Sequence, residues 1–390
     1  MWSNREHINS TINILLFLLA INFLHLGQLL LPIICLIIFI DSKLVFKVNN
    51  LLTFIILCLF GITFLCFSYR TGFYSTMGLC LPMAYYIGSN VKNHDEESIK
   101  NVVYLLTFGM ALHLVFNFIF EAFIDGINLF NSVNHYDVWI KDYIPTTALA
   151  TNLIFILSLI YYIAFREKNK TIKTIGLVLF SIVIFYNLAL GRRTPLLMLG
   201  LCVTVSFVID KTILNNKRIN TSKILKIFGV CLLAIIIVVS IYEFNIFNCK
   251  EFINNLGIVK KFVQYGFDTG RLDIFFGALK LMPTHLWGNQ EIHNILGIQV
   301  HDLWMDTFDY AGIIPFVLLI IHSIIFVLVF INLLKNRNIS KDFKMFVVVL
   351  FFAVTIQLFL EPIMSGSSLF IIIVVLVEAI LENKLIYESK

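Results

Sequence analysis

Charged residues are scarce in this sequence: Asp, Glu, Lys and Arg together make up 14% of the 390 residues, whereas hydrophobic residues make up 59%. A soluble domain typically has about 25% charged residues. Apolar runs long enough to cross a bilayer recur along the whole chain, so the sequence predicts a polytopic membrane protein. This composition excludes the nucleic-acid-binding, fibrous and secreted disulfide-rich classes of protein.

The chain also lacks the cysteine pattern of a disulfide framework. Six of its seven cysteines lie within apolar runs, and only Cys249 falls in a predicted loop. Buried cysteine behaves as a small hydrophobic residue, so no disulfide is expected. The sequence has no Gly/Ser-rich or Pro-rich linker, no internal repeat and no cleavable signal, so we expect a single integral membrane domain over residues 1–390.

The apolar runs are continuous rather than alternating, which in lipid favours helices over a closed barrel. The expected fold class is therefore all-α: a polytopic transmembrane helical bundle of about twelve spans. The expected spans are Thr11–His25, Gly27–Ile40, Leu51–Ser68, Thr71–Ser89, Asn101–Phe123, Pro145–Phe165, Thr174–Leu190, Thr194–Ile209, Ile224–Phe244, Asp302–Leu334, Phe343–Leu360 and Ile363–Leu381. The tenth is too long for one span, so its first part, to about Gly312, is expected to form a short helix outside the membrane.

The distribution of positive charge predicts the orientation of the bundle. With the N-terminus inside and the spans alternating, 20 of the 29 Lys and Arg residues lie on the inner side. The positive-inside rule then places both termini in the cytoplasm. Two outer segments are longer than turns: Ile124–Ile144, and Asn245–His301 between spans nine and ten. A structureless loop of the second length would be unusual, so we expect it to be functional and partly helical.

The segment Gly191-Arg192-Arg193-Thr194-Pro195 places two adjacent arginines at a predicted outer membrane surface. A guanidinium group can donate two parallel hydrogen bonds to a phosphate. Thr194 can cap the following helix, with Pro195 in its first turn, and a helix N-terminus also attracts anions. The segment therefore indicates an anion site. The alternative is that the arginines only extend toward the lipid headgroups.

A third arginine, Arg271, lies in the long outer loop. Asp268 and Asp273 flank it, and an amphipathic stretch, Ile274–Leu281, follows. Its guanidinium group could bind an anionic ligand. The alternative is an Arg–Asp contact that makes the loop rigid.

The segment from His301 to Gly312 has the pattern of a helix that begins at His301. Its spacing puts Asp302, Asp306 and Asp309 on one face. The positive end of the helix dipole disfavours a charged imidazolium, so we expect His301 to be neutral and able to act as a general base. We expect the three carboxylates to form a solvated face. A divalent-metal site is the alternative.

Several other residues are weaker candidates. Arg70, at another outer turn, is the rival of the arginine pair, and His285 and His293 are rivals for the role of the base. Glu361 lies in a short outer turn, and Trp304 lies on the second face of the predicted helix.

Three of these features make the chain similar to the bacterial O-antigen polymerase and ligase family, the Wzy-type integral membrane glycosyltransferases. Gly191–Pro195 opens a span in mid-chain, with Arg193 in the position of the family's arginine. Arg271 precedes an aromatic stretch with Ala-Leu in a large outer loop. His301-Asp302-Leu303-Trp304 is followed by Gly312-Ile313-Ile314-Pro315 before the last spans. The chain departs from the family's pattern where Asp302 replaces a frequent Asn and where Pro195 replaces a small residue.

The resemblance implies a metal-independent, inverting glycosyltransferase without a cofactor in the bacterial cytoplasmic membrane, with its active site on the outer face. It would transfer an O-antigen or capsule chain from undecaprenyl pyrophosphate to a sugar hydroxyl of another lipid-linked repeat unit. His301, Arg271 and Arg193 would be catalytic. The residues expected to bind substrate are Arg192, Asp302, Asp306, Trp304, Arg70, His293 and Glu361. Expected partners are membrane lipid, a chain-length regulator and a flippase, with no nucleic acid.

Two alternatives remain open at the level of the sequence. A ligase would pass the same chain to the lipid A core of lipopolysaccharide. A transporter or flippase for lipid-linked sugar would need polar residues along a path through the membrane. The ionisable residues seen within apolar helices are His25, His113 and His322, which we expect to hydrogen-bond across the bundle. The polar motifs instead gather outside the membrane, which favours an enzyme.

Overall fold

The computed structural model describes residues 2–71, 77–91, 95–131, 134–146, 149, 151–209, 270–361, 363–366 and 368–388, together with single residues between 211 and 263. The longer helices are α1 (Trp2–Ala20), α2 (Gly27–Asp41), α3 (Leu51–Ser68), α4 (Met77–Asn90), α5 (Glu96–Asp125), α7 (Leu153–Arg166), α8 (Lys170–Ala189), α9 (Thr194–Ile209), α13 (Arg271–Leu281), α16 (Ile313–Lys335), α17 (Lys341–Leu360) and α19 (Ser368–Glu388). The shorter helical elements are η1 (Phe23–His25), η2 (Tyr69–Thr71), η3 (Gly126–Asn131), η6 (Met282–Thr284), α14 (Glu291–Leu296), α15 (Leu303–Ala311) and α18 (Ile363–Gly366).

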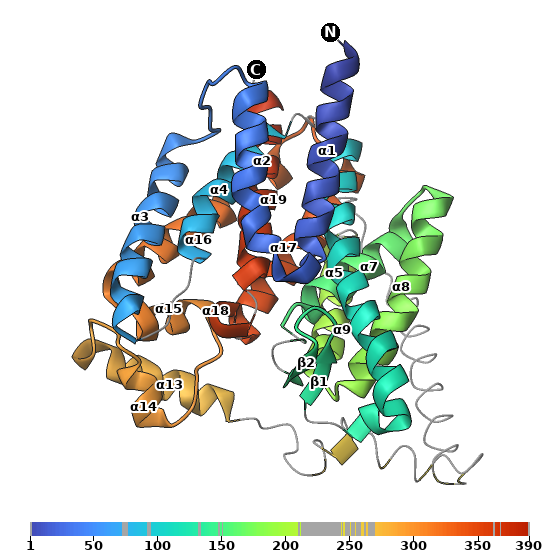
Figure 1. Ribbon diagram of the computed structural model, residues 1–390, viewed down its shortest axis with the longest axis vertical. Coiled ribbons are helices and arrows are strands. Elements are labelled where there is room, and N and C mark those ends of the chain that lie inside the picture. The colour runs from blue at the N-terminus through green and yellow to red at the C-terminus, as the bar shows by residue number, and fades with distance from the viewer. Residues whose placement is uncertain are drawn as a thin grey trace.

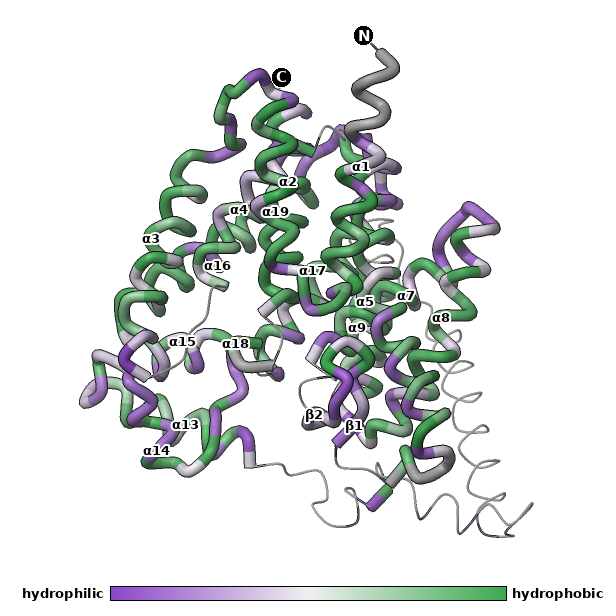
Figure 2. The backbone as a smooth tube through the Cα atoms, viewed as in Figure 1, coloured by the Kyte–Doolittle hydropathy of each residue, from purple (hydrophilic) through white to green (hydrophobic). Residues whose placement is uncertain are grey.

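Apolar helices dominate the described part of the chain. Five of them are long and apolar enough to cross a membrane, namely Leu51–Thr71, α5, α8, α16 and α17. Shorter apolar helices include Asn9–Ala20, α2, α7 and α9. Hydrophobic residues run along the helices, and hydrophilic residues gather at the ends and in the connections (Figure 2). These features indicate a helical membrane protein, as its composition predicts.

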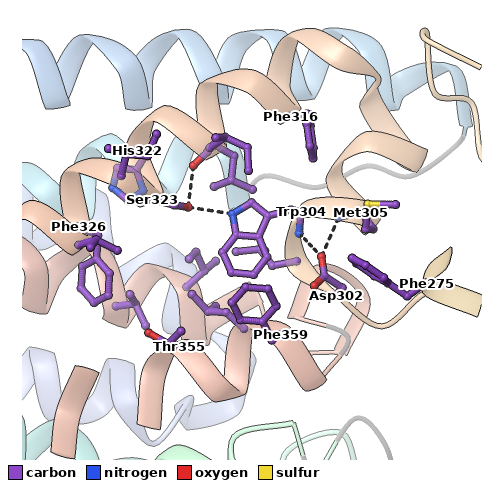
Figure 3. A pocket seen from close by; sticks show the side chains of 18 of the residues that line it. Phe275, Asp302, Trp304, Met305, Phe316, His322, Ser323, Phe326, Thr355 and Phe359 are labelled. Atoms are coloured by element: carbon purple, nitrogen blue, oxygen red, sulfur yellow. Dashed lines mark hydrogen bonds between the residues drawn. The ribbon is translucent and has the colours of Figure 1, made fainter. Parts of the chain in front are cut away.

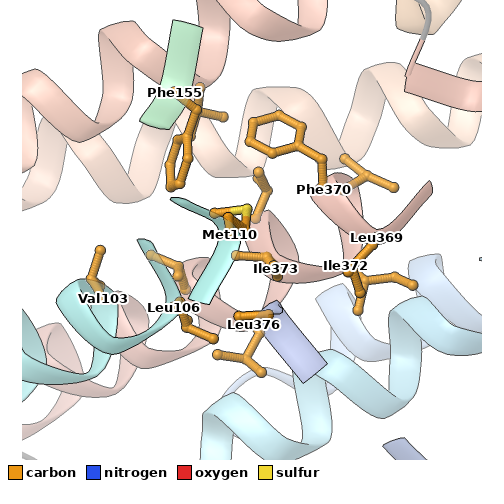
Figure 4. Packing of buried hydrophobic residues seen from close by; sticks show 14 of the residues in the cluster. Val103, Leu106, Met110, Phe155, Leu369, Phe370, Ile372, Ile373 and Leu376 are labelled. Carbon is orange, nitrogen blue, oxygen red and sulfur yellow. The ribbon is translucent and has the colours of Figure 1, made fainter. Parts of the chain in front are cut away.

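Helix α19 lies in the interior of the bundle. Every residue from Leu369 to Leu381 is buried. Its apolar side chains pack against Val103, Leu106 and Met110 of α5 and Phe155 of α7 (Figure 4). On another side it touches α4, where a Cβ atom added at Gly88 would lie 2.3 Å from the carbonyl oxygen of Leu376. Close contact between these two helices therefore requires glycine at that position.

The elements that carry the polar motifs gather at one end of the bundle. The N- and C-terminal ends lie at the opposite end from α13, α14 and the strand pair (Figure 1). Strands β1 (Asn134–Asp137) and β2 (Asp142–Pro145) pair in antiparallel register, with Asn134 opposite Pro145. Asp137 stabilises their turn, because its Oδ1 accepts hydrogen bonds from the backbone N–H groups of Trp139 and Ile140.

Several expected boundaries agree with the structure. Helices α3 and α9 have the predicted limits, and the long tenth segment divides at Gly312 into α15 and α16, as expected. Gly312 has φ +81°, a conformation that interrupts a helix and favours glycine. The long loop is partly helical, as expected: α13, η6 and α14 lie between Arg271 and Leu296, and residues 285–290 form turns.

Other expectations fail or are untested. The expected span Pro145–Phe165 was wrong at its start, because Pro145 ends strand β2 and α7 begins at Leu153. Residues 142–145 pair with strand β1, so they are not available to begin a helix. The expected span Ile224–Phe244 lies outside the described residues.

Candidate functional site

The turn between α8 and α9 positions Arg192. Gly191 has φ +62° and ends α8 in a Schellman motif, with the N–H of Gly191 bonded to the carbonyl of Leu188 and the N–H of Arg192 bonded to the carbonyl of Asn187. The Asn187 side chain donates to the carbonyl of Arg192 at 2.9 Å. Helix α9 then begins at Thr194, with Pro195 in its first turn, as the sequence predicts. This turn therefore fixes the backbone of Arg192.

Arg271 is fixed by a contact far away in the sequence. It is the first residue of α13, after Gly270 in the left-handed conformation. Its Nη1 donates to the carbonyl of Leu360, at the C-terminus of α17, over 2.5 Å. A helix C-terminus has free carbonyl groups and a partial negative charge, which the guanidinium group neutralises. The sequence interpretation of an Arg–Asp contact is not supported for Asp273, which is exposed; Asp268 lies outside the described residues.

Glu361 follows directly after α17 and lies in the field of both arginines. The side chain is only 1% exposed. Burial raises the pKa of its carboxyl to about 6, and the positive charges of Arg192 and Arg271 oppose that rise. In turn, burial lowers the pKa of Arg192, the charge of Glu361 raises it and the charge of Arg271 lowers it. The charges of Glu361, Arg192 and Arg271, from segments far apart in the sequence, thus act on one another.

His301 belongs to the same group. Burial lowers the pKa of its imidazole to about 4, assisted by the charges of Arg271, Arg192 and His293. The imidazole is therefore neutral at pH 7, as expected, although the cause is burial and positive neighbours. The backbone of His301 is left-handed, with φ +60°. This conformation is costly for a residue with a Cβ atom, and such strain concentrates at functional sites.

Polar atoms without partners mark this cluster. Arg192 Nε, His301 Nδ1, His293 Nδ1 and Glu361 Oε2 are buried and have no hydrogen-bond partner in the described part of the chain. Such atoms usually find a partner, so their concentration in one place is characteristic of a site completed by a ligand or by water. We call Arg192, Arg271, His301 and Glu361 the polar cluster.

The two rival histidines differ in their positions. His293 is brought near His301 by α14, whose first N–H groups bond to Asp309: those of Ile292 and His293 lie 3.0 and 3.3 Å from its Oδ1. His285 instead lies 3.8 Å from the exposed Glu291 and contacts Thr284. The structure therefore places His293, and not His285, beside the polar cluster.

The carboxylates of the α15 segment are buried, so the expected solvated face was wrong. Asp302, Asp306 and Asp309 are 4%, 1% and 5% exposed. Asp302 is the N-cap of α15 and accepts from the N–H groups of Trp304 and Met305, and Asp309 caps α14. Burial raises the pKa of Asp306 well above its ordinary value, and the charges of Asp302 and Asp309 add to this effect. Backbone N–H groups thus replace water as the partners of Asp302 and Asp309, and burial disfavours the charged form of Asp306.

Among the described residues, no group of three or more His, Cys, Asp or Glu side chains is arranged to hold a metal ion. The capping roles of Asp302 and Asp309 show what two of the three aspartates do instead.

An apolar pocket of about 490 Å³ opens beside α15. Trp304 stands in it, with its indole N–H bonded to Ser323 and its ring 4.4 Å from that of Phe359 (Figure 3). Asp302 lies at the α15 side of the same pocket, and the rest of the lining comes mainly from apolar residues of α16, α17 and α19. The pocket thus joins the segment that carries His301 to the apolar body of the bundle.

The other two predicted arginines, Arg70 and Arg193, are not among the charges that shift the pKa of His301 and Glu361. The exposed guanidinium group of Arg70 lies over the ring of Phe67, 5.4 Å from its centroid. Arg193 is partly exposed, and its carbonyl accepts from the N–H of Leu197 in α9. The charges that shift the pKa of His301 and Glu361 come from Arg192 and Arg271. The catalytic role of Arg193 remains a prediction from the resemblance.

A second group of ionisable residues joins strand β1 to α5 and η1, and the sequence did not point to its members His135 and Asp137. His135 Nδ1 lies 2.7 Å from Glu121 Oε1, and both side chains are fully buried. Asp137 lies 3.1 Å from His113 and 3.5 Å from His25. The alternation of buried residues in β1 could have revealed His135 and Asp137, but four residues give too short a pattern.

A third group lies inside the bundle. His322 of α16 lies 2.9 Å from Glu378 of α19. One turn further along α19, Glu382 accepts hydrogen bonds from Tyr85 and Asn50. His322 thus forms an ion pair with another helix of the bundle, whereas His25 and His113 lie near Asp137 of strand β1. The interpretation that all three histidines hydrogen-bond across the bundle was therefore right in part only. Glu378 and Glu382 were missed because the apolar run around them extends to Leu381.

The polar cluster combines two half-buried cations, one neutral imidazole and one buried carboxyl whose pKa is raised to about 6. Such a set can bind a phosphate-type anion, stabilise charge that develops on it, and accept a proton nearby. The sequence of the chain matches no known protein-family model and no curated protein.

Proposed function

We propose that the protein is a membrane glycosyltransferase of the O-antigen polymerase kind. It would transfer a glycan from undecaprenyl pyrophosphate to a sugar hydroxyl of another lipid-linked repeat unit. The observation that carries this proposal is the convergence of Arg192, Arg271 and a neutral His301 from three segments far apart in the sequence. These segments are also the ones that carry the family resemblance.

In the proposed reaction, the guanidinium groups of Arg192 and Arg271 bind the diphosphate and stabilise its charge as the glycosidic bond to it breaks. His301 accepts the proton of the acceptor hydroxyl as the new bond to the sugar carbon forms. The apolar pocket beside Trp304 is wide enough to receive the first isoprene units of the carrier lipid. The glycan is thus transferred from the diphosphate of the carrier lipid to a sugar hydroxyl in water.

This proposal includes the orientation expected from the sequence. The bundle has about twelve spans, both termini are cytoplasmic, and the polar cluster faces the outer side of the bacterial cytoplasmic membrane. The arrangement of both chain ends opposite α13 and α14 supports this orientation (Figure 1). A ligase that uses the lipid A core as acceptor would require the same site, so the acceptor distinguishes the two.

One observation favours a transporter as the second candidate. His322, Glu378 and Glu382 lie within apolar helices, and the first two are buried at 5% and 0% exposure. Ionisable residues inside a membrane often mark a path for protons or substrate. In a flippase, the polar cluster would then be a binding site at one end of that path.

The surface polysaccharide of a strain that lacks the gene separates these functions. A polymerase predicts loss of the chain-length ladder with a single capped repeat retained. Loss of all capped material, with polymer left on the carrier lipid, would indicate a ligase. Lipid-linked repeat units retained on the inner face would contradict an enzyme and support a flippase.

A further inference from the structure

Glu361 is not explained by the proposed reaction. A diphosphate site needs positive charge, yet a carboxyl follows directly after Leu360, whose carbonyl accepts from Arg271 Nη1, and the charges of Arg271 and Arg192 act on this carboxyl. Its backbone is held at the end of α17, with its N–H bonded to Gln357 and its carbonyl accepting from Ile363. Glu361 Oε2 is buried without a partner among the residues described. The side chain is therefore fixed in place but incompletely bonded.

The positive charges of Arg192 and Arg271 explain why a carboxyl is buried at this position. The charge of Arg271 acts on half-buried Arg192. Two guanidinium groups that interact in this way repel each other and lose hydration, so a counter-ion stabilises them. In the empty protein, Glu361 is the carboxyl whose charge reaches Arg192. When a diphosphate binds, its own negative charge neutralises the arginines. A carboxylate at the same place would then repel the diphosphate. Protonation removes that repulsion and creates an O–H donor.

We propose that Glu361 is the internal counter-ion of the anion site: its carboxylate balances Arg192 and Arg271 while the site is empty, and it takes up one proton from the solvent when a diphosphate binds. This inference rests on the proposed function in one respect, the choice of diphosphate as the ligand. Glu361 is a positioning residue here, since it controls the charge of the arginines that hold the ligand.

The surroundings of Glu361 make such proton uptake feasible near neutral pH. The charges that act on it come from Arg192 in the turn before α9 and from Arg271 in α13. His301, before α15, and His293, in α14, lie in the same group and are linked to the two arginines. Burial brings the pKa of Glu361 to about 6 in the empty protein. An added diphosphate would raise it further, because like charge disfavours the carboxylate.

Binding of inorganic pyrophosphate to the full-length protein in lipid nanodiscs tests the inference. Calorimetry in two buffers with different ionisation enthalpies counts the protons taken up between pH 5.5 and 8. Glu361→Gln, which is neutral and of the same shape, should bind more tightly than the wild type, by up to about tenfold for each pH unit above about 6. It should also take up about one proton fewer. Because pyrophosphate titrates identically in both experiments, its own protonation cancels in the comparison.

Two variants serve as controls. Glu291→Gln removes an exposed carboxylate elsewhere and should behave as the wild type. Glu361→Asp keeps the charge and should keep the proton uptake, so the inference stays testable if Glu361→Gln does not fold. Equal affinity and equal proton uptake in Glu361→Gln and the wild type would overturn the inference.

Failure of the inference can be told apart from failure of the proposed function. If Arg192→Ala and Arg271→Ala lose pyrophosphate while Glu361→Gln changes nothing, the anion site stands and the counter-ion role is wrong. If the wild type binds no pyrophosphate at any pH, the anion site and the proposed function are both contradicted.

Discussion

At the scale of the residue, the local turn decides which of two adjacent arginines joins the polar cluster. The sequence identifies the Arg pair, but the resemblance places weight on Arg193, whereas the charge that reaches His301 and Glu361 is that of Arg192. The Schellman motif at Gly191 fixes the backbone of Arg192. A motif in one sequence shows which chemistry is present. It does not show which side chain interacts with the charge of Glu361, because that interaction joins residues far apart in the chain.

The first prediction compares these arginines. Arg192→Ala and Arg271→Ala should each lower polymer synthesis more than tenfold, since a charge-assisted contact to phosphate contributes about 1.5–3 kcal/mol. Lysine should restore little, because it cannot form the same pair of hydrogen bonds. Arg193→Ala is the matched control and should retain more activity than Arg192→Ala. The reverse order, measured at equal protein levels in the membrane, would return the role to Arg193.

The second prediction concerns His301 and pH. His301→Ala should lose activity by about 10²–10⁴-fold, the usual contribution of a general base, while His285→Ala retains most of it. Because the pKa of His301 is lowered to about 4, its imidazole stays neutral when the pH falls from 7 to 5.5. The initial rate should therefore not fall over this range through protonation of the base. A fall with a midpoint near 6.5 would indicate a histidine with an ordinary pKa.

At the scale of the element, the sequence predicts helices better than it predicts the other elements. Continuous apolar runs predict α3, which Asn50 caps, and α9, and Gly312 marks the break before α16. The strand pair from Asn134 to Pro145 was missed because its strands have four residues each. Its stability comes from contacts with α5 and from the turn at Asp137, which no local pattern reveals.

The third prediction tests the packing that holds the α15 segment. Gly288 and Gly297 both have positive φ, of +73° and +69°. A Cβ atom at Gly288 would lie 2.6 Å from the backbone nitrogen of Gly312, whereas Gly297 has nothing within 4 Å among the described atoms. Gly297→Ala should therefore cost only the backbone strain, about 1 kcal/mol, and Gly288→Ala roughly 2 kcal/mol or more.

Thermal unfolding of the two purified variants measures the difference. The Gly288→Ala protein should unfold at the lower temperature and lose activity in parallel, because its loop precedes α14 and contacts the end of α15. Equal stability of the two variants would show that the contact between Gly288 and Gly312 is not tight.

At the scale of the whole molecule, the distribution of Lys and Arg predicts the orientation of the bundle, with both termini in the cytoplasm. The fourth prediction uses a background without the native cysteines. A cysteine at the exposed Glu291 should react with a membrane-impermeant thiol reagent in intact cells or spheroplasts. A cysteine at the exposed Asn338, between α16 and α17, should react only after lysis. Labelling in the opposite pattern would invert the bundle and remove the outer active site.

The single most direct measurement is the reaction of the purified protein in liposomes with lipid-linked repeat units extracted from a strain that lacks the gene. We predict that the wild type joins the repeat units into longer chains and releases undecaprenyl pyrophosphate, and that Arg192→Ala and His301→Ala do neither. Added EDTA should leave the rate unchanged. Repeat units that cross the bilayer without being joined would contradict the proposed glycosyltransferase and identify the polar cluster as part of a transporter.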